Sequence, residues 1–286
     1  MSILRFTPQD HSYTSISQED NTKWISVTSF ISNFKQPFDA DKIAEKSSKS
    51  KKSKWYGMTP EEIKQAWSNE ALRATTLGTW YHNCRESDIC SLETIERHGN
   101  TVPIFKPIEI DGTKFSPNQK LTDGVYPEHM VYLKSAGLCG QSDLVEVING
   151  VVHITDYKTN KEIKIEGYTN WEGITTKMNS PVAHLDDCNV NHYALQLSLY
   201  MYIILKHNHL YSPGKMVLHH IIFKESGKDK FGNPIAELNS HGDPIVEEVV
   251  QYEVPYLKQE VIALIKWLKE NRDKIKTKIE NKKNQK

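Results

Sequence analysis

The sequence lacks any long hydrophobic run. No segment approaches the roughly 20 apolar residues that a membrane-spanning helix needs. The first residues, MSILRFTPQDHSY, contain no long apolar stretch of the kind found in secretory signals. We therefore predict an intracellular, cytoplasmic protein with no membrane partner. A chain of 286 residues with 38% hydrophobic content is long enough for one large domain or two small ones.

An excess of charge of either sign is also missing. The chain has 36 basic and 36 acidic residues, so its overall charge does not indicate a nucleic-acid partner. Lysines are nevertheless concentrated in the serine-rich segment 41–54 and at the C-terminal end, 266–286. Such clusters suit binding to a phosphate backbone, but they also suit ordinary solvated surface, and both interpretations remain open.

Cysteine is scarce. The four cysteines do not form a C-x-x-C pair, and their positions are Cys84, Cys90, Cys139 and Cys188. We expect reduced structural thiols, as is usual inside cells.

Two strands joined by Asn149-Gly150 form the clearest local pattern in the sequence. Apolar-rich runs at 143–148 and 151–158 flank that dipeptide, which strongly favours a two-residue hairpin turn. In such a hairpin, paired residues have numbers with a constant sum. Asp143 is therefore predicted to lie opposite Asp156.

One face of this hairpin is expected to carry charge at its open end. Side chains alternate along a strand, so Asp143 and Asp156 share a face with Lys158 and with the apolar residues Val145, Val147, Val152 and Ile154. Two carboxylates with Cβ atoms about 5 Å apart repel each other unless positive charge lies between them. Lys158 could supply that charge at a solvated strand end.

A divalent cation fits this pair of carboxylates better. Mg²⁺ binds through one or two carboxylates and leaves its other positions to water and phosphate. Lys158 could then orient or deprotonate the attacking water, or neutralise charge developing on the phosphate. The arrangement is that of a phosphodiester-cleaving site in outline.

Two predicted helices carry further candidates. On a helix over 77–96, Gly78, His82 and Glu86 lie one turn apart on one face. On an amphipathic helix over 191–206, Gln196 and Tyr200 share a stripe. Taken alone, His82 and Glu86 are more often a polar surface pair than part of a site. Gln196 and Tyr200 taken alone are usually structural.

The remaining elements are predicted from turn residues and periodicity. We expect a hairpin over 11–26, a helix capped by Ser26 or Thr28, and a helix beginning at Thr59-Pro60. Further strands are expected over 126–133, 216–224 and 246–254, with a long loop over 163–190 that could border a nucleic-acid channel.

Four pieces of this sequence, in order, resemble the PD-(D/E)XK nuclease superfamily in its RecB-type branch. Asp143, followed by Asp156-Tyr157-Lys158-Thr159, resembles motifs II and III. The segment 78–86, GTWYHNCRE, is similar to the upstream G-x-x-x-H-x-x-x-E motif, and 196–200, QLSLY, is similar to the downstream Q-x-x-x-Y motif. The segment 26–28 and the long helix predicted over 193–204 also resemble phage-encoded and mitochondrial single-strand exonucleases of this branch.

The resemblance implies an α/β fold of the restriction-endonuclease-like type, with a mixed central β-sheet flanked by helices. We expect a single nuclease domain over 1–286, with an N-terminal hairpin and helix unit at about 1–58 and a basic C-terminal helix at about 255–286. It also implies a Mg²⁺-dependent DNA nuclease, with Mn²⁺ as a substitute. An exonuclease acting on DNA ends or single strands in recombination, repair or replication is expected, in a phage or bacterial setting.

The alternatives are a catalytically idle nuclease fold that serves in DNA binding or assembly, and a structure-selective endonuclease. A metal hydrolase with another substrate would need similar site chemistry.

The resemblance also assigns roles to residues. Asp143, Asp156, His82 and the backbone carbonyl of Tyr157 would hold the metal, and Lys158 would assist the attacking water. Supporting roles fall to Glu86, Gln196 and Tyr200.

Glu128 occupies the place of a glutamate that some relatives have before motif II, although an ordinary edge-strand glutamate is the commoner explanation. Some RecB-type nucleases hold an iron-sulfur cluster through one upstream cysteine and a C-terminal trio of cysteines. No cysteine follows Cys188, so we expect no such cluster.

Overall fold

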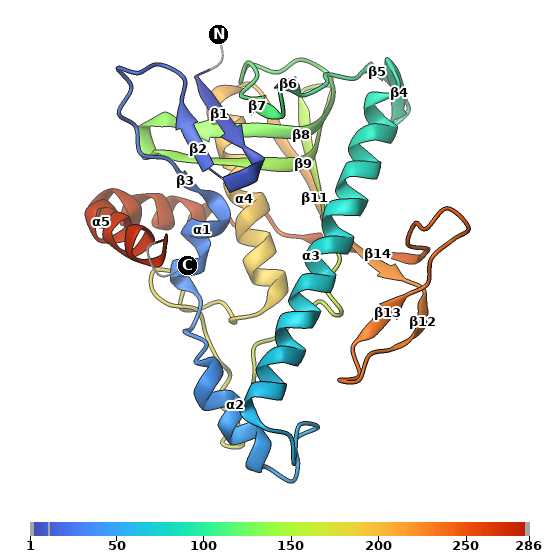
Figure 1. Cartoon of the computed structure of the whole chain (residues 1–286). Helices are drawn as coiled ribbons and strands as arrows, with labels where there is room; N and C mark the ends of the chain where they lie inside the picture. Colours follow the sequence, from blue (N-terminus) through green and yellow to red (C-terminus); the bar gives the residue numbers. More distant parts are fainter. Residues whose placement is uncertain (1–2, 11, 284–286) are drawn as a thin grey trace.

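The computed structural model describes residues 3–10 and 12–283, with side chains as far as Arg272 (Figure 1). Its helices are α1 (Val27–Ile31), α2 (Ala40–Lys49), α3 (Pro60–Cys90), α4 (Asn189–His207) and α5 (Lys258–Lys283). Short 3-10 turns occur at η1 (Pro8–Asp10), η2 (Ser32–Phe34) and η3 (Lys134–Ala136). The strands are β1 (Leu4–Thr7), β2 (Ser12–Ser15), β3 (Ile25–Ser26), β4 (Thr94–Arg97), β5 (Asn100–Pro103), β6 (Ile108–Ile110), β7 (Thr113–Phe115), β8 (Gly124–Leu133), β9 (Leu138–Ile148), β10 (Val151–Lys158), β11 (Ser212–Phe223), β12 (Glu225–Lys228), β13 (Pro234–Ala236) and β14 (Val246–Val254).

The central sheet has the order β14-β11-β10-β9-β3, and β8 also pairs with β9. The β10/β11 and β3/β9 pairs are parallel, whereas β8/β9, β9/β10 and β11/β14 are antiparallel. The sheet is therefore mixed and is flanked by helices, which confirms the predicted fold class. Smaller sheets are formed by β2-β1-β7-β6, β12-β13 and β4-β5.

The hairpin formed by β9 and β10 has the predicted register. Ile148 pairs with Val151, and the constant sum continues as far as Leu144 with Thr155. Both turn residues have positive φ, 52° at Asn149 and 72° at Gly150, as a type I′ turn requires. This local turn chemistry explains why the pairing could be predicted from the sequence.

Helices cover both faces of the central sheet. On one face, apolar side chains of β9 and β10 pack with α1, α4 and α5 in the largest hydrophobic cluster; those side chains are Val145, Val147, Val152 and Ile154. On the other face, α3 packs through Ile89 against Leu144 and Ile148. Figure 1 shows α3 along one side of the molecule and α5 on the other. The carboxylates of the hairpin therefore lie at the end of a well-packed sheet.

The N-terminal hairpin differs from the prediction. β1 pairs with β2, whereas the hairpin was predicted over 11–26. The polar segment 18–21 connects β2 to β3, and β3 pairs with β9. Pairing with β9 buries Ile25 in the main core, which a surface hairpin would not do. Ser26 caps α1 as expected, by accepting a hydrogen bond from the backbone N–H of Ser29.

The helix predicted over 77–96 is part of a longer one. α3 begins at a capping box, in which Thr59 and Glu62 bond reciprocally to each other's backbone N–H, and it runs unbroken to Cys90. Residues 94–97 instead pair with 100–103 across His98-Gly99, both with positive φ. A two-residue hairpin turn therefore replaces the last predicted helical turns.

The other predicted elements are close to those observed. β8, β11 and β14 contain the strands predicted over 126–133, 216–224 and 246–254, except that β11 ends at Phe223. Residues 163–188 form an irregular segment between β10 and α4. Among residues 3–10 and 12–283, we find no helix long and apolar enough to cross a membrane.

Candidate active site

Asp143 and the segment Asp156–Lys158 lie where β10 separates from β9. β10 pairs with residues 144–148 of β9, while β3 pairs with residues 138–139. Asp143 lies between these two paired stretches, and its Oδ2 accepts a hydrogen bond of 2.7 Å from the backbone N–H of Tyr157. A carboxylate thus replaces a main-chain acceptor at the point where the ladder ends. This arrangement opens the sheet and holds Asp143 in place.

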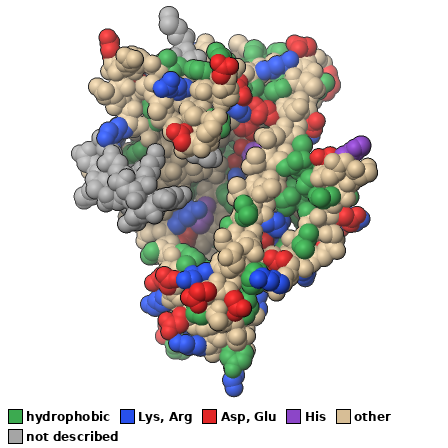
Figure 2. Space-filling model, viewed as in Figure 1, with side chains coloured by type: hydrophobic (Ala, Val, Ile, Leu, Met, Phe, Trp, Pro, Cys, Tyr) green, Lys and Arg blue, Asp and Glu red, His purple; other side chains and the backbone are tan. Residues whose placement is uncertain are grey.

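A cleft of about 760 Å³ opens at this point. Its walls come from β1, β2, β3, β7, β8 and β9 and from α1, α3 and α4, and its lining includes Ser26, His82, Glu86, Gln141 and Tyr200. In the space-filling view the molecule is hollowed beside α3, with Lys or Arg and His side chains visible inside (Figure 2). The site is therefore open to a ligand of considerable size.

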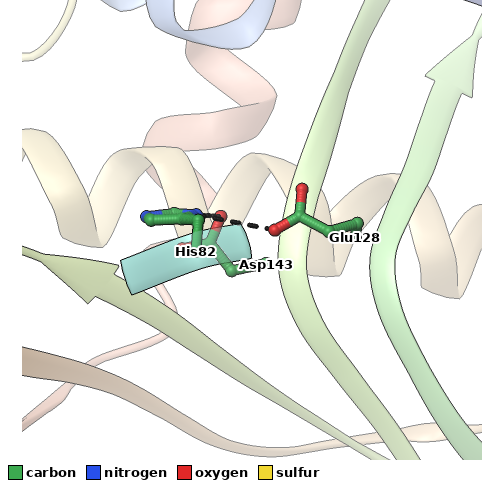
Figure 3. Close-up of side chains that lie close together, drawn as sticks. All are labelled: His82, Glu128 and Asp143. Atoms are coloured by element: carbon green, nitrogen blue, oxygen red, sulfur yellow. Dashed lines mark ion pairs between the residues drawn. The ribbon is translucent and has the colours of Figure 1, made fainter. Parts of the chain in front are cut away.

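His82, Glu128 and Asp143 converge in this cleft from α3, β8 and β9 (Figure 3). His82 Nδ1 lies 3.5 Å from an Oε of Glu128 and 3.5 Å from an Oδ of Asp143. One ligand atom from each residue lies within 4.8 Å of the other two. Imidazole nitrogen and carboxylate oxygens at such spacing can hold a divalent cation.

The orientation of His82 depends on α3. Its Nε2 lies 3.4 Å from the backbone carbonyl oxygen of Tyr157, and an N–H there would leave Nδ1 to face the carboxylates. α3 comes this close because it has a glycine at position 78, where a Cβ would be 3.0 Å from Thr159 Oγ1. That hydroxyl donates to the carbonyl of Ala74, which joins the end of β10 to α3.

Asp156 lies beside this group and has two other partners. One of its oxygens forms a close ion pair with Lys158, and the other accepts a hydrogen bond of 3.1 Å from Gln196 Nε2 on α4. Gln196 Nε2 is also 3.4 Å from the hydroxyl of Tyr200. Lys158 Nζ lies 4.7 Å from the ring centroid of Tyr193. The polar stripe of α4 thus contacts the D-x-K strand end directly.

The electrostatic environment opposes negative charge at the centre. Burial and repulsion from Asp156 raise the pKa of Asp143 to about 8. Burial lowers the pKa of His82, but a hydrogen bond to Glu128 and attraction by Asp143 outweigh it and raise that pKa to about 9. Burial likewise lowers the pKa of Lys158, and the charges of Asp156 and Asp143 raise it above the ordinary value. Carboxylates this close to one another favour the binding of a cation between them.

Glu128 lies closer to the centre than its sequence context indicated. On β8 it falls opposite Asp143, between the pairs Pro127–Leu144 and His129–Ser142. Its φ of 48° is unusual for a residue with a side chain and marks local strain at a site. Its other carboxylate oxygen, Oε2, accepts a hydrogen bond from Nε2 of Gln141. The register of β8 against β9 places Glu128 there, and the sequence did not indicate that register.

Glu86 lines the same cleft but does not reach the three-residue group. Its two carboxylate oxygens pair with Lys114 Nζ of β7 at 2.9 and 3.0 Å. Lys114 and Gln141 contact Glu86 and Glu128 here but were not identified from the sequence as site residues. Lys114 lies on β7, which pairs with the distant strand β1. Gln141 lies on β9, whose pairing with β8 is set by the irregular turn at η3.

The residues present suit a hard divalent cation. Nitrogen from His82 and oxygens from Glu128 and Asp143 provide the donors, and the raised pKa of Asp143 shows that the group accommodates a second carboxylate charge poorly without a cation. Asp156 and the Tyr157 carbonyl adjoin this group; in this structure they contact Lys158, Gln196 and His82.

A mixed sheet flanked by helices, with carboxylates and a lysine where two strands separate, defines a restriction-endonuclease-like protein. The family model of the PD-(D/E)XK nuclease superfamily matches residues 42–286, and the chain belongs to this superfamily. Divalent metals are typical of such nucleases, and the family implies DNA as the substrate. The chain matches no curated protein and no solved structure.

Proposed function

We propose that this protein is a Mg²⁺- or Mn²⁺-dependent DNA nuclease of the RecB-type branch, acting as an exonuclease on DNA ends or single strands. One observation carries the proposal: His82, Glu128 and Asp143 meet beside the Asp156–Lys158 ion pair in a cleft. A purely structural site has no need for carboxylates that repel each other. The proposed setting is cytoplasmic DNA recombination, repair or replication in a phage or bacterium.

The metal ligands we propose are His82, Asp143 and Glu128, with Asp156 and the Tyr157 carbonyl able to complete the set. When bound, a divalent cation supplies positive charge that offsets the charge developing on the phosphate. Cation binding at Nδ1 of His82 would displace the Nδ1 proton, while Nε2, which lies 3.4 Å from the Tyr157 carbonyl oxygen, would keep its proton and orient the ring. Asp143 also fixes the main chain at Tyr157, which sets the position of Lys158.

Lys158 acts on the reacting groups. Its ammonium group is held by Asp156 and faces the ring of Tyr193, so it can donate to the attacking water or to a phosphate oxygen. Gln196 holds Asp156 from the other side and thereby positions this ion pair. Tyr200 supports Gln196, and Glu86 holds Lys114 at the edge of the cleft.

Residues 1–286 form a single nuclease domain in this proposal. The N-terminal unit at about 1–58 supplies β3 at the edge of β9 and the cleft residue Ser26. The basic helix at about 255–286 packs against α4 through buried residues of its first turns, Val261, Leu264 and Ile265. Its lysines beyond residue 272 lie outside the described side chains.

The test is digestion of single- and double-stranded DNA labelled at the 5′ or the 3′ end, with Mg²⁺, Mn²⁺ or EDTA. We expect metal-dependent loss of the end label, and Lys158→Ala should lower the rate by more than about 100-fold, since losing charge stabilisation of this kind costs 10²–10³. The matched control is Lys206→Ala, because Lys206 also faces a tyrosine ring, at 5.4 Å, but on the far part of α4.

Each outcome separates the candidate activities. Progressive shortening from one end supports the exonuclease and gives its polarity, whereas internal cuts at junctions or flaps point to a structure-selective endonuclease. Metal-dependent thermal stabilisation with no cleavage of any linear or circular substrate would contradict the proposal and favour an idle DNA-binding or assembly module.

A further inference from the structure

A second cavity of about 450 Å³ lies against β8, next to the active-site cleft. It is enclosed by β6, β7, β8 and the segments that precede and follow the β6–β7 hairpin. Figure 1 shows β6 and β7 beside β8 at the end of the molecule where α3 finishes. The aromatic and charged side chains that line it include Phe105, Lys106, Lys114, Lys120, Tyr126 and Glu128.

The two cavities meet at the cluster of possible metal ligands. Glu128 and Lys114 line both the second cavity and the active-site cleft. Glu128 has the left-handed backbone conformation described above, which interrupts the regular alternation of β8 at this point. A linear ligand bound at Glu128 can therefore extend from one cavity into the other.

An aromatic platform forms one wall of the second cavity. The rings of Phe105 and Tyr126 stack with centroids 4.7 Å apart and planes at 12°. The hydroxyl of Tyr126 is held by the backbone of Thr122, to whose carbonyl it donates at 2.8 Å. Phe105 rests over Gly124, where a Cβ would be 2.4 Å from the ring. The platform is thus rigid, yet Phe105 remains 41% exposed.

Three lysines accompany these rings. Lys106 pairs with the exposed carboxylate of Glu93 at 2.9 Å, a contact that water and salt weaken. Lys120 donates closely to the backbone carbonyl of His207, a neutral acceptor. Lys114 lies where the cavities join. Stacking surfaces interleaved with positive charge are how proteins bind single-stranded nucleic acid without regard to sequence.

We propose that this second cavity binds an unpaired nucleotide of single-stranded nucleic acid, on the strand that continues past the metal-binding group. The inference rests on the proposed nuclease function and narrows its substrate class to single strands. A cavity of about 450 Å³ is within the range of small-ligand sites and is of a size to hold one nucleotide. The base stacks on Phe105, while Lys106 and Lys120 contact phosphates.

The first test measures binding of a fluorescein-labelled 12-mer of deoxythymidine in Mg²⁺, with every variant built on the cleavage-impaired Lys158→Ala chain. Phe105→Leu keeps the apolar packing over Gly124 but removes the stacking face. We expect it to raise the Kd about tenfold, equivalent to about 1.4 kcal/mol, and Phe105→Tyr to restore affinity. Phe38→Leu is the matched control, because Phe38 is also exposed and contacts an aromatic ring, Trp67.

The second test measures how this affinity depends on salt. Each phosphate contact to a single strand contributes about 0.7 to the slope of log K against log salt concentration. Lys106→Ala should therefore reduce the slope by about 0.7. Lys224→Ala should not change it, because Lys224 forms a comparable exposed pair, with Glu237 at 3.0 Å, outside both cavities.

The outcomes distinguish this inference from the function on which it rests. If the wild type cleaves single strands but Phe105→Leu binds as tightly as Phe38→Leu, with equal melting temperatures, the second cavity is not a nucleotide site. Equal effects of Phe105→Leu on a blunt duplex and on the single strand would also overturn it. If the wild type cleaves no nucleic acid with any metal, the proposed function itself fails.

Discussion

At the scale of single residues, Asp143 is placed where its charge is unfavourable in the absence of a cation. Burial and the neighbouring Asp156 raise its pKa to about 8. A folded-state pKa above the unfolded value of about 3.8 means that the wild type loses stability as the pH rises from about 4 to about 8, because the unfolded carboxyl ionises first. The residue therefore opposes folding and favours cation binding.

Asp143→Asn should consequently raise the melting temperature in EDTA, and the gain should grow from pH 5 to pH 8. Asparagine keeps an acceptor for the Tyr157 N–H but carries no charge. A chain of this size gains roughly 2–4 °C per kcal/mol of relieved repulsion. The same variant should lose the melting shift that Mg²⁺ causes in the wild type, together with cleavage. Differential scanning calorimetry with EDTA or Mg²⁺ measures both effects.

Glu146→Gln provides the matched control on the same strand. Glu146 is also buried, but it forms a close ion pair with Arg97 on the opposite face of the sheet. Removing its charge should lower the melting temperature and leave the Mg²⁺ shift unchanged. If Asp143→Asn destabilises the EDTA form as Glu146→Gln does, the repulsion argument is wrong.

At the scale of secondary-structure elements, α4 and β9 approach closely because residue 140 is glycine. A Cβ there would lie 2.7 Å from Cε1 of Tyr200. The ring is buried and its hydroxyl lies beside Gln196, which in turn holds Asp156. The distance between α4 and β9 therefore affects the position of Gln196, and through Gln196 the position of Asp156 in the D-x-K motif, residues 156–158.

Gly140→Ala should destabilise the protein by about 1–3 kcal/mol, the usual cost of overpacking, and should lower cleavage by displacing Tyr200 and Gln196. Urea unfolding and cleavage rates measure the two effects. The control is Gly227→Ala on β12, where no atom lies within 4 Å of the added Cβ. If the two variants have equal free energies of unfolding, the Tyr200 ring can move aside without destabilising the protein, and the prediction is wrong.

Among the secondary-structure elements, the sequence predicted one strand pairing but missed another pairing and the full length of α3. The β9–β10 register was predictable because a two-residue Asn-Gly turn fixes it locally. The β8–β9 register was not, because η3 and Gly137 connect these strands in a longer irregular turn, and so the approach of Glu128 to Asp143 was missed. The continuity of α3 was also missed, because none of residues 67–76 is buried and the apolar periodicity is interrupted there.

At the scale of the whole molecule, the chain before residue 42 is part of the fold although the family model does not cover it. β3 pairs with β9, and α1 packs against α4 in the main core. Phe30 of α1 is fully buried and meets Phe34 edge to face, with centroids 5.3 Å apart. The segment thus supports the two elements that carry Asp143 and Gln196.

Phe30→Ala should therefore lower the free energy of unfolding by about 3–5 kcal/mol, the usual cost of truncating a buried phenylalanine. Phe38→Ala is the matched control a short distance along the same segment, because Phe38 is 66% exposed and its loss should cost little. Chemical denaturation of both variants measures the difference. If the first 41 residues were a separate appendage, Phe30→Ala would leave the main unfolding transition and the Mg²⁺ shift of the active site unchanged; if they are part of one cooperative domain, that transition moves as a whole.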